Sequence, residues 1–554
     1  MVLLQGDEGV NMEEIKGILE TIKNLKGLPN VKEPSFQALR SQAEIFGTET
    51  IWGNYNFVST VKNRSAGLTV YTGSDEVMNR NWSARQREII KGVPDTLRLI
   101  QEYIKQAPFI YVRRNMGKNN VFSPLCNLFV SVQRKEMIRL AYMWAQTLSP
   151  PLDTPGPQQY LVYIPEWQEK DRQILVFPEV STTFVLGSDY YGESKKGHLR
   201  MAMWNVKQQG MLGLHAGSKI IYARDTKTNN IKKYGILIFG LTATGKTTHS
   251  CHDHGLDLPG EGIEILQDDV VFLRKDGSCL GTEKGFYLKT EGVNPQTQPV
   301  IYQAATSRDC IFENVFVNYR GEVDFDNETL TSNGRGVMQR DDFGKLKGED
   351  INLPPVADLD GLIILFITRR NNIVPILSKL NLEQAACAFM LGESIESSGS
   401  DPKRAGESVR EVGTNPFIIG DFAEEGNRFY DIISQYPEKV ECYLVNTGGV
   451  GEIVELLDDG AKVVKQKVLR PEIPETAANI RNIVRGTIEW EKEPYFGTLV
   501  PKRVAEGIDI DKFNPQKFYT ATQLELLINQ LKEERRKYME QFPKLYPLIV
   551  KAFK

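Results

Sequence analysis

A strand-like run that leads directly into a glycine-rich loop constrains the fold most strongly. The run "KKYGILIFG" (232–240) has the length and apolar character of a buried strand, and Gly240-x-x-x-x-Gly245-Lys246-Thr247 follows it without a gap. A strand, this loop and a helix form the context in which backbone N–H groups wrap a phosphate. The sequence therefore predicts an α/β nucleotide-binding domain whose loop residues contact the nucleotide: Gly240, Leu241, Thr242, Ala243, Thr244, Gly245, Lys246, Thr247 and Thr248.

Two aspartates and three histidines follow the loop. Asp268 and Asp269 interrupt the strand-like run "IEILQDDVVFL" (263–273), 22 and 23 positions after Lys246. Carboxylates at a strand end beside a phosphate loop suit the metal that accompanies a nucleotide, although a turn with two solvated acids is the alternative. For His249, His252 and His254 we expect the frayed end of the post-loop helix, because no fourth ligand stands at metal-site spacing.

The remaining pattern predicts two domains. Helices are expected over 13–27 and 133–147, and strand-like runs include 108–115 and "GLIILFITRR" from Gly361. We place an α/β substrate-binding domain at 1–230 and the nucleotide-binding domain at 231–554, which ends in a charged amphipathic helix over 521–540. The segment 393–413, rich in Ser, Gly and charge, is either a solvated linker or a mobile lid over the phosphate site.

Composition excludes several classes of function. The chain has 554 residues with 67 basic and 71 acidic side chains, which give a net charge of −4. This balance lacks the excess of positive charge that is typical of nucleic-acid-binding proteins. The longest apolar runs are strand-sized, well short of the ~20 residues that a membrane span needs. The six cysteines are scattered with no C-x-x-C pair. This cysteine usage favours a reducing, cytoplasmic compartment. The charge and the short apolar runs predict neither nucleic acid nor a membrane as a partner.

A second group of motifs precedes the phosphate loop. The stretch "YYGESKKGHLRMAMWNVKQQGMLGLHAGSK" combines Tyr190, Lys195, Lys196 and, 19 positions beyond Lys196, His215. Together with the loop and Asp269, in this order, it resembles ATP-dependent phosphoenolpyruvate carboxykinase. In that family a Tyr-Gly-Gly-Glu-x-Lys-Lys-Gly stretch is followed at the same distance by a metal-ligating histidine. The resemblance spans residues 50–515, and the order of the blocks is its most specific feature.

Further blocks extend the resemblance and assign roles to single residues. They are "NRSAG" (63–67), "GFYLKT" (285–290), "VDFDNETLTSNGR" (323–335) and "YLVNTG" (443–448). The resemblance places Arg64 at the arginine that clamps the substrate carboxylate and Lys289 at a nucleotide-contacting lysine. It places Arg335 at the γ-phosphate arginine, and Arg470 and Thr476 in the pocket for adenine and ribose.

The resemblance also implies a fold and a reaction. The fold is a two-domain α/β architecture, with an N-terminal substrate domain and a C-terminal phosphate-loop domain built on mixed sheets. The reaction is the reversible conversion of oxaloacetate and ATP to phosphoenolpyruvate, CO₂ and ADP, a step of gluconeogenesis. A monomer or small homo-oligomer is expected.

The implied cofactors are Mn²⁺ and Mg²⁺. Lys196, His215 and Asp269 would hold Mn²⁺, with Lys196 as the neutral amine, and Thr247 would hold the Mg²⁺ of ATP. The resemblance assigns substrate contacts to Arg64, Tyr190, Lys196 and Arg335. It assigns the chemistry itself to four basic side chains, of which Lys196 acts as the neutral amine: Lys195, Lys196, Lys246 and Arg335.

Several positions depart from the family pattern. Ala243 stands where the family usually has glycine, Val300 stands at a family glutamate, and "QDDVVFL" lacks the acid and histidine that usually follow the aspartates. These departures put in question which nucleotide and which substrate the protein binds. The proposed metal ligands Lys196, His215 and Asp269 are all present. Two alternatives therefore stay open: a kinase of another small-molecule acceptor on the same scaffold, and a non-catalytic nucleotide-binding regulator.

Overall fold

The computed structural model describes residues 12–153, 156–241, 244–395, 407–456 and 462–553. The chain forms two compact units, and it crosses between them more than once. Unit 1 comprises Met1–Gln209, Glu283–Gly285 and Thr306–Gln339, and unit 2 comprises Gly210–Thr282, Phe286–Ala305 and Arg340–Lys554. The first boundary lies after Gln209 rather than at 230, because β11 (Ala216–Arg224) pairs along its whole length with β12 (Ile231–Gly240), the strand that precedes the phosphate loop.

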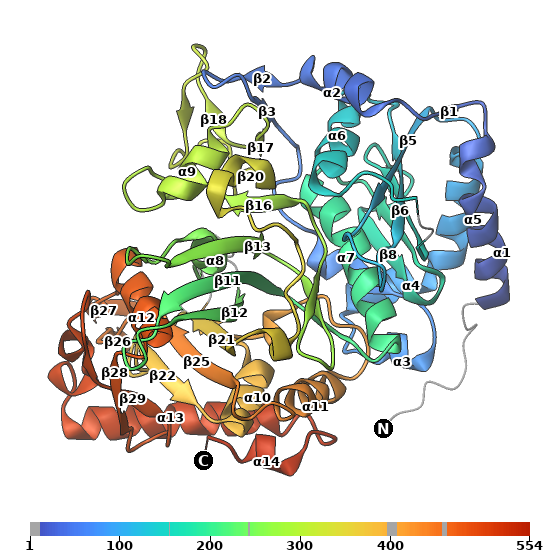
Figure 1. Ribbon diagram of the computed structural model, residues 1–554. Helices are drawn as coiled ribbons and strands as arrows, with labels where there is room; N and C mark the ends of the chain where they lie inside the picture. Colours follow the sequence, from blue (N-terminus) through green and yellow to red (C-terminus); the bar gives the residue numbers. More distant parts are fainter. Residues whose placement is uncertain (1–11, 154–155, 242–243, 396–406, 457–461, 554) are drawn as a thin grey trace. The chain divides into compact units, whose positions relative to one another are not determined.

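A seven-stranded mixed sheet forms the centre of unit 1. Its strands, in spatial order, are β1 (Val31–Lys32), β5 (Phe109–Asn115), β6 (Leu125–Ser131), β7 (Gln158–Ile164), β9 (Thr182–Leu186), β8 (Gln173–Phe177) and β4 (Thr69–Tyr71). Helices α1 (Met12–Lys23), α4 (Ala84–Lys91) and α5 (Val93–Tyr103) cover one face, and α6 (Ile138–Thr147) and α7 (Tyr191–Gln208) cover the other (Figure 1). The apolar stripe of α1, which includes Ile15, Leu19 and Ile22, is buried in the core on the first face.

A smaller sheet in unit 1 supports the loop that carries Arg64. The parallel pair β17 (Ile311–Glu313) and β3 (Tyr55–Phe57) is flanked by the antiparallel strands β20 (Arg335–Gln339) and β2 (Thr48–Glu49). Beyond it the hairpin of β18 (Phe316–Val317) and β19 (Val323–Asp324) turns at Arg320 and Gly321. The short helices α2 (Phe36–Glu44) and α3 (Asp75–Met78) complete the unit.

Unit 2 is organised around an eight-stranded sheet. Its order is β13 (Gly262–Gln267), β11, β12, β21 (Gly361–Thr368), β25 (Val440–Asn446), β22 (Leu377–Leu380), β29 (Leu499–Val504) and β28 (Ile488–Lys492). The three central strands β12, β21 and β25 are parallel, and every residue of β21 is buried. A central parallel strand is covered on both faces, which explains its unbroken apolar run.

Helices cover both faces of this sheet (Figure 1). On one side lie α10 (Leu382–Leu391), α11 (Phe422–Ile433), α13 (Ala521–Met539) and α14 (Pro547–Val550), which build the largest apolar core of the unit. On the other lie α8 (Lys246–Cys251) and α12 (Ile473–Arg485). Further elements are α9 (Pro299–Ala305), β16 (Gly285–Lys289), and the paired strands β26 (Ile453–Leu456) and β27 (Lys462–Gln466). This mixed α/β organisation confirms the predicted fold class.

Two sequence expectations need adjustment here. The run 263–273 is not one strand: β13 ends at Gln267, and β14 (Val271–Leu273) joins a separate sheet between β10 (Leu212–Leu214) and β15 (Cys279–Gly281). Within 393–413, β23 (Glu393–Ile395) pairs antiparallel with β24 (Ser408–Arg410), and residues 396–406 lie outside the described part of the chain. None of the described helices is both long and apolar enough to cross a membrane.

Candidate active site

Helix α7 carries the two adjacent lysines of unit 1 in a buried setting. Lys195 Nζ donates to Glu283 Oε2 at 2.6 Å, and the two side chains are 0% and 2% exposed. Lys196 is buried on the same helix. Glu283 is distant in sequence from Lys195 and lies just outside the block "GFYLKT" (285–290), so sequence reasoning did not find it. The whole Ser-Lys-Lys-Gly stretch lies within this buried helix.

Asn333 joins three parts of unit 1 that the sequence analysis treats separately. Its Oδ1 accepts from Arg335 Nη2 at 2.6 Å. Its Nδ2 donates to the Lys62 carbonyl at 2.7 Å and to the Tyr190 hydroxyl oxygen at 3.2 Å. Since Lys62 is two residues before Arg64, this one amide brings the segment of the predicted carboxylate clamp together with Tyr190 and Arg335. Asn333 lies inside the block "VDFDNETLTSNGR" (323–335), in which the resemblance gave a role only to Arg335.

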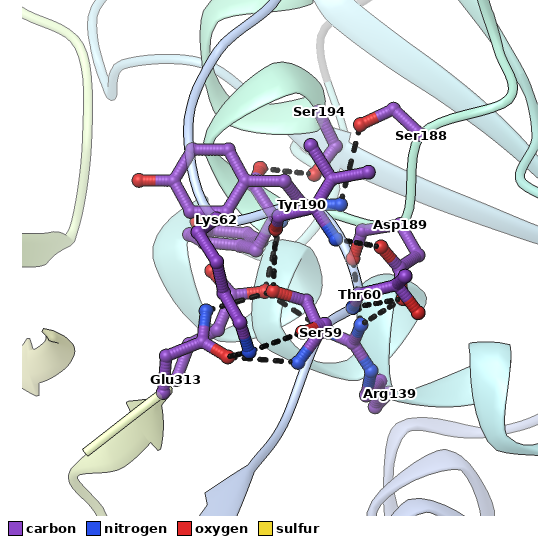
Figure 2. Close-up of polar contacts among 12 residues, drawn as sticks. Ser59, Thr60, Lys62, Arg139, Ser188, Asp189, Tyr190, Ser194 and Glu313 are labelled. Atoms are coloured by element: carbon purple, nitrogen blue, oxygen red, sulfur yellow. Dashed lines mark hydrogen bonds and ion pairs between the residues drawn. The ribbon is translucent and has the colours of Figure 1, made fainter. Parts of the chain in front are cut away.

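The loop that carries Arg64 is anchored at its start by Asp189 (Figure 2). The Asp189 carboxylate accepts from Thr60 N at 2.8 Å and from Val61 N at 2.9 Å. Lys62 Nζ donates to Asn314 Oδ1 at 2.8 Å. These bonds fix the backbone on one side of Arg64, whose own side chain is exposed. On the other side, Ser65 N donates to Glu193 of α7.

A buried arginine ties this anchor to the start of α7. Arg139 Nη2 donates to the Asp189 carbonyl at 2.6 Å, and Arg139 Nη1 donates to Glu313 Oε1 at 3.0 Å (Figure 2). The same Glu313 oxygen accepts from Tyr191 N, the first residue of α7. Burial raises the pKa of Glu313 to about 7, against the opposing charge of Arg139. The lysine-bearing helix and the Arg64 loop are thus held by one polar network.

The phosphate loop of unit 2 has the predicted strand–loop–helix form. β12 ends at Gly240, and α8 begins at Lys246. Gly245 has a φ of 102°, in the left-handed region that favours glycine, and a Cβ on Gly240 would lie 2.4 Å from Thr244 Oγ1. Thr244 Oγ1 in turn donates to the Leu241 carbonyl at 2.8 Å. Thr242 and Ala243 lie outside the described residues.

Asp269 links the phosphate-loop lysine to the predicted metal-binding histidine. Asp269 Oδ1 lies 3.1 Å from Lys246 Nζ and 3.0 Å from His215 Nε2. By contrast, Asp268 Oδ2 accepts from Tyr287 N at 3.0 Å. The turn after β13 therefore gives the two aspartates different partners, and Asp269 faces the loop.

The donor set at Asp269 fits a divalent cation. His215 Nδ1 lies 2.6 Å from the Thr414 carbonyl, which can only accept, so Nδ1 carries the hydrogen. Nε2 then faces a carboxylate oxygen at 3.0 Å, a pair that needs a proton or a metal cation between its atoms. A histidine oriented by a backbone carbonyl and an adjacent carboxylate are common metal ligands. Among the described residues no three His, Cys, Asp or Glu side chains gather at one point.

The other nucleotide residues occupy several elements of unit 2. Thr247 is partly exposed next to Lys246, whereas Thr248 Oγ1 donates to Gln298 Oε1 at 3.0 Å. Lys289, the last residue of β16, pairs with Glu291. Thr476 lies buried in the first turn of α12, and Arg470 lies exposed shortly before that helix.

A second arginine lies near Arg470 and was missed by the sequence reasoning. Burial and, next, the positive charge of Arg470 lower the pKa of Arg369, which follows β21 by one residue. Two guanidinium groups close enough to affect each other create a region that suits an anion. Arg369 stands directly after the strand-like run, but that position alone gave no reason to select it.

The histidines after the loop are not the frayed end that the sequence predicts. His249 and His254 are almost fully buried. They surround Lys219, whose Nζ bonds to the carbonyls of His249 at 2.8 Å and His252 at 2.7 Å, and to His254 Nε2 at 2.6 Å. A buried amine from the neighbouring strand β11 therefore organises the end of α8.

Comparison with known proteins gives a consistent result. A family model described as phosphoenolpyruvate carboxykinase matches residues 49–510. The protein named phosphoenolpyruvate carboxykinase (ATP) from Aeropyrum pernix is 30% identical over 489 residues, which cover 87% of this chain and 92% of that protein. Proteins of the same name from Rhodopseudomonas palustris strain HaA2 and Leptospira biflexa are 25% and 27% identical over 335 and 336 residues, about 60% of this chain and 56% of each relative.

Proposed function

Since the chain belongs to the ATP-dependent phosphoenolpyruvate carboxykinase family, we propose that it decarboxylates oxaloacetate and phosphorylates the resulting enolate with ATP. The observation that carries this proposal within the site is the position of Asp269. Its carboxylate contacts both the phosphate-loop Lys246 and His215. A carboxylate that contacts both residues suits a phosphoryl-transfer site, where it would help to hold a divalent cation beside the phosphate loop.

The cofactors belong to the same proposal. His215 and Asp269, with Lys196 as the neutral amine, would hold Mn²⁺, and Thr247 would contact the Mg²⁺ of ATP. When bound, these cations supply Lewis-acid stabilisation for the enolate oxygen and for the transferring phosphoryl group. The hydrogen bond between His215 and the Thr414 carbonyl supports the ligand role, because it directs Nε2 toward Asp269.

The cationic side chains of the chain have separate tasks. Arg64 is proposed to clamp the substrate carboxylate in the bidentate way that a lysine cannot reproduce. Arg335 and Lys246 are proposed to offset the charge that develops on the γ-phosphoryl group during transfer. Lys195 keeps a positive charge near the reacting carbon atoms, because the buried Glu283 carboxylate holds its ammonium in one place. The Tyr190 ring forms part of the wall of the substrate pocket.

Positioning and exclusion of water complete the mechanism. The polar network of Arg139, Asp189 and Glu313 fixes the Arg64 loop and the start of α7 before substrate binds. Preorganised charges of this kind need no rearrangement during the reaction. Lys195 and Lys196 are buried. Exclusion of water from the enolate would favour its phosphorylation over its protonation to pyruvate, and the proposal assigns that exclusion to the segment 393–413, of which residues 396–406 lie outside the described part of the chain.

The proposal assigns substrate binding to unit 1 and nucleotide binding to unit 2. Lys289, Arg470 and Thr476 are proposed to contact the nucleotide, together with the phosphate loop. A place in gluconeogenesis, a cytoplasmic location and a monomeric or small homo-oligomeric state also stay predictions.

The test is an assay of oxaloacetate-dependent phosphoenolpyruvate formation with ATP, with Mg²⁺ alone and with Mg²⁺ plus Mn²⁺. We expect activity to rise with Mn²⁺ and to collapse in Lys196→Ala. Lys207→Ala is the matched control, because Lys207 lies on the same helix and pairs with the half-exposed Glu76. ATP binding without phosphoenolpyruvate in either direction, and no effect of Lys196→Ala, would contradict the proposal and favour a kinase of another acceptor.

A further inference from the structure

The C-terminal helix α13 lies outside the region that matches the family model, which ends at residue 510. It is nevertheless integrated into unit 2. Its N-terminus has a capping box between Thr520 and Gln523, and its apolar stripe packs in the main core of the unit. The buried stripe contains one charged residue, Arg535. A charge in this position requires an explanation, because an apolar side chain of similar size would pack there at least as well.

Arg535 is enclosed by a carboxylate and two aromatic rings. Its Nε donates to Glu393 Oε2 at 3.2 Å, and its Nη2 donates to Glu393 Oε1, which makes a bidentate pair. The guanidinium carbon lies 5.1 Å from the centre of the Phe496 ring and 4.9 Å from that of Phe553. Burial alone would raise the pKa of Glu393, but the charges of Arg535 and Arg370 lower it to about 2. The pair is therefore ionised at neutral pH.

Glu393 and its neighbours form a compact charged group at the base of the β23–β24 pair. We call it the stem cluster, and its members are Arg370, Glu393, Arg410, Glu534 and Arg535. Glu534, also on α13, accepts from Arg410 Nη2 at 3.1 Å. Two consecutive residues of the C-terminal helix thus hold one end of each strand of this pair.

The stem cluster is connected to the phosphate loop by hydrogen bonds. The Thr368 hydroxyl, at the end of β21, donates to the Glu393 carbonyl. The Thr368 carbonyl accepts from Thr447 N at 3.0 Å. Thr447 Oγ1 lies 2.9 Å from the Thr244 carbonyl of the loop, to which it donates. The path from α13 to the loop therefore runs through Glu393, Thr368 and Thr447, and every step is a direct contact.

The strand order explains why this path is short. β21 is the parallel neighbour of β12, and Ile367 of β21 pairs with Gly240, the last residue before the phosphate loop. Carboxyl ends of neighbouring parallel strands lie at one edge of the sheet, where α/β proteins bind nucleotides. A shift at the end of β21 would therefore move a backbone that borders the loop.

We propose that Arg535 is a positioning residue for the nucleotide, and that the C-terminal helix fixes the phosphate loop through Glu393, Thr368 and Thr447. The proposal rests on the nucleotide-binding half of the proposed function. It does not depend on which acceptor receives the phosphoryl group. Coupling through such networks typically changes a binding constant by about 3- to 30-fold.

The experiment measures the Kd for ATP by calorimetry and the Tm in wild type, Arg535→Met, Arg535→Lys and Glu393→Gln. Arg536→Met is the matched control, because Arg536 lies on the exposed side of the same helix and pairs with Glu533 and Glu540. We expect Arg535→Met to raise the Kd for ATP about 3- to 30-fold, with KM for ATP rising in parallel and KM for oxaloacetate unchanged. We expect the control to stay within about twofold of wild type.

Two further variants keep the test decisive if Arg535→Met folds poorly. Arg535→Lys retains the charge but loses the bidentate contact, so we expect a smaller rise in the Kd for ATP. In the double variant Arg535→Met/Glu393→Gln the rise should not exceed that of the stronger single variant, because both changes break one path.

Three outcomes would overturn the inference. A lower Tm with unchanged Kd for ATP, measured where the variant is folded, would mean that Arg535 only stabilises the fold. Additive effects of Arg535→Met and Glu393→Gln would mean that Arg535 does not act through Glu393. A wild-type chain that binds no ATP would overturn this inference and the proposed function together, whereas ATP binding without phosphoenolpyruvate formation would contradict only the proposed function.

Discussion

The buried pair of Lys195 and Glu283 allows a quantitative prediction. The two charges lie 2.6 Å apart with side chains at most 2% exposed. With an effective dielectric constant of about 20, their attraction is roughly 6 kcal/mol before the cost of removing both groups from water. Removal of one partner of such a pair typically costs about 3–5 kcal/mol. We therefore expect Glu283→Gln to lower the free energy of unfolding by about 3–5 kcal/mol.

The same variant should also impair catalysis. Without the Glu283 carboxylate the Lys195 ammonium loses the group that fixes its position, and misplacement of a reacting group by 1 Å can cost about 100-fold in rate. We expect kcat for phosphoenolpyruvate formation to fall by about that factor. The measurements are urea unfolding followed by circular dichroism and a steady-state assay with ATP and oxaloacetate.

The double variant Lys195→Met/Glu283→Leu separates the two effects. Replacement of a buried ion pair by apolar side chains is often neutral or stabilising, so stability should return toward the wild-type value. Activity should not return, because Lys195 is absent. The reasoning is refuted if Glu283→Gln is as stable and as active as wild type, or if the double variant regains activity.

Three other predictions follow from single contacts. Asn333→Asp keeps an acceptor for Arg335 but cannot donate to the Lys62 carbonyl or the Tyr190 hydroxyl. We expect kcat/KM for oxaloacetate to fall about tenfold. A rise in the calorimetric Kd for ATP as well would argue against a role of Asn333 confined to the substrate site. Burial lowers the pKa of Lys219 from 10.5 to about 7. Between these two pH values Lys219 is protonated in the unfolded chain and neutral in the folded chain. The free energy of unfolding should then rise between pH 7 and 10.5, and urea titrations of Lys219→Met should lose this rise. Asp269→Asn should require at least tenfold more Mn²⁺ for half-maximal activity. An unchanged Mn²⁺ titration would show that Asp269 does not ligate Mn²⁺.

Local patterns in the sequence were sufficient to predict much of the nucleotide unit. The strand before the loop, the apolar strand β21 and the C-terminal helix all have periodicities that a short window reveals. The break between β13 and β14 could not be read in this way, because apolar residues continue on both sides of Asp268 and Asp269. The turn is set by the joining of the two strands to different sheets, which is a tertiary property.

The partners of the site residues were the least predictable part. Glu283 reaches Lys195 across 88 positions, and Asn333 reaches Lys62 across 271. Asn333 lies inside one quoted block and Glu283 just before another, but the resemblance gave neither a role, and only the folded unit brings each to its partner. The histidines after the loop are a further example, because the partner of the buried His254 is Lys219 of β11, which is 35 positions away in the sequence.

In the proposed reaction the phosphoryl group of ATP is transferred to the enolate made from oxaloacetate. The most direct measurement incubates the protein with ATP labelled in the γ-phosphate, Mg²⁺ and Mn²⁺, with and without oxaloacetate, and follows the label and CO₂. We expect label in phosphoenolpyruvate only when oxaloacetate is present, with one CO₂ released for each phosphoryl group transferred. Transfer of label to another acceptor, or release of labelled phosphate at the same rate without oxaloacetate, would contradict the proposed reaction.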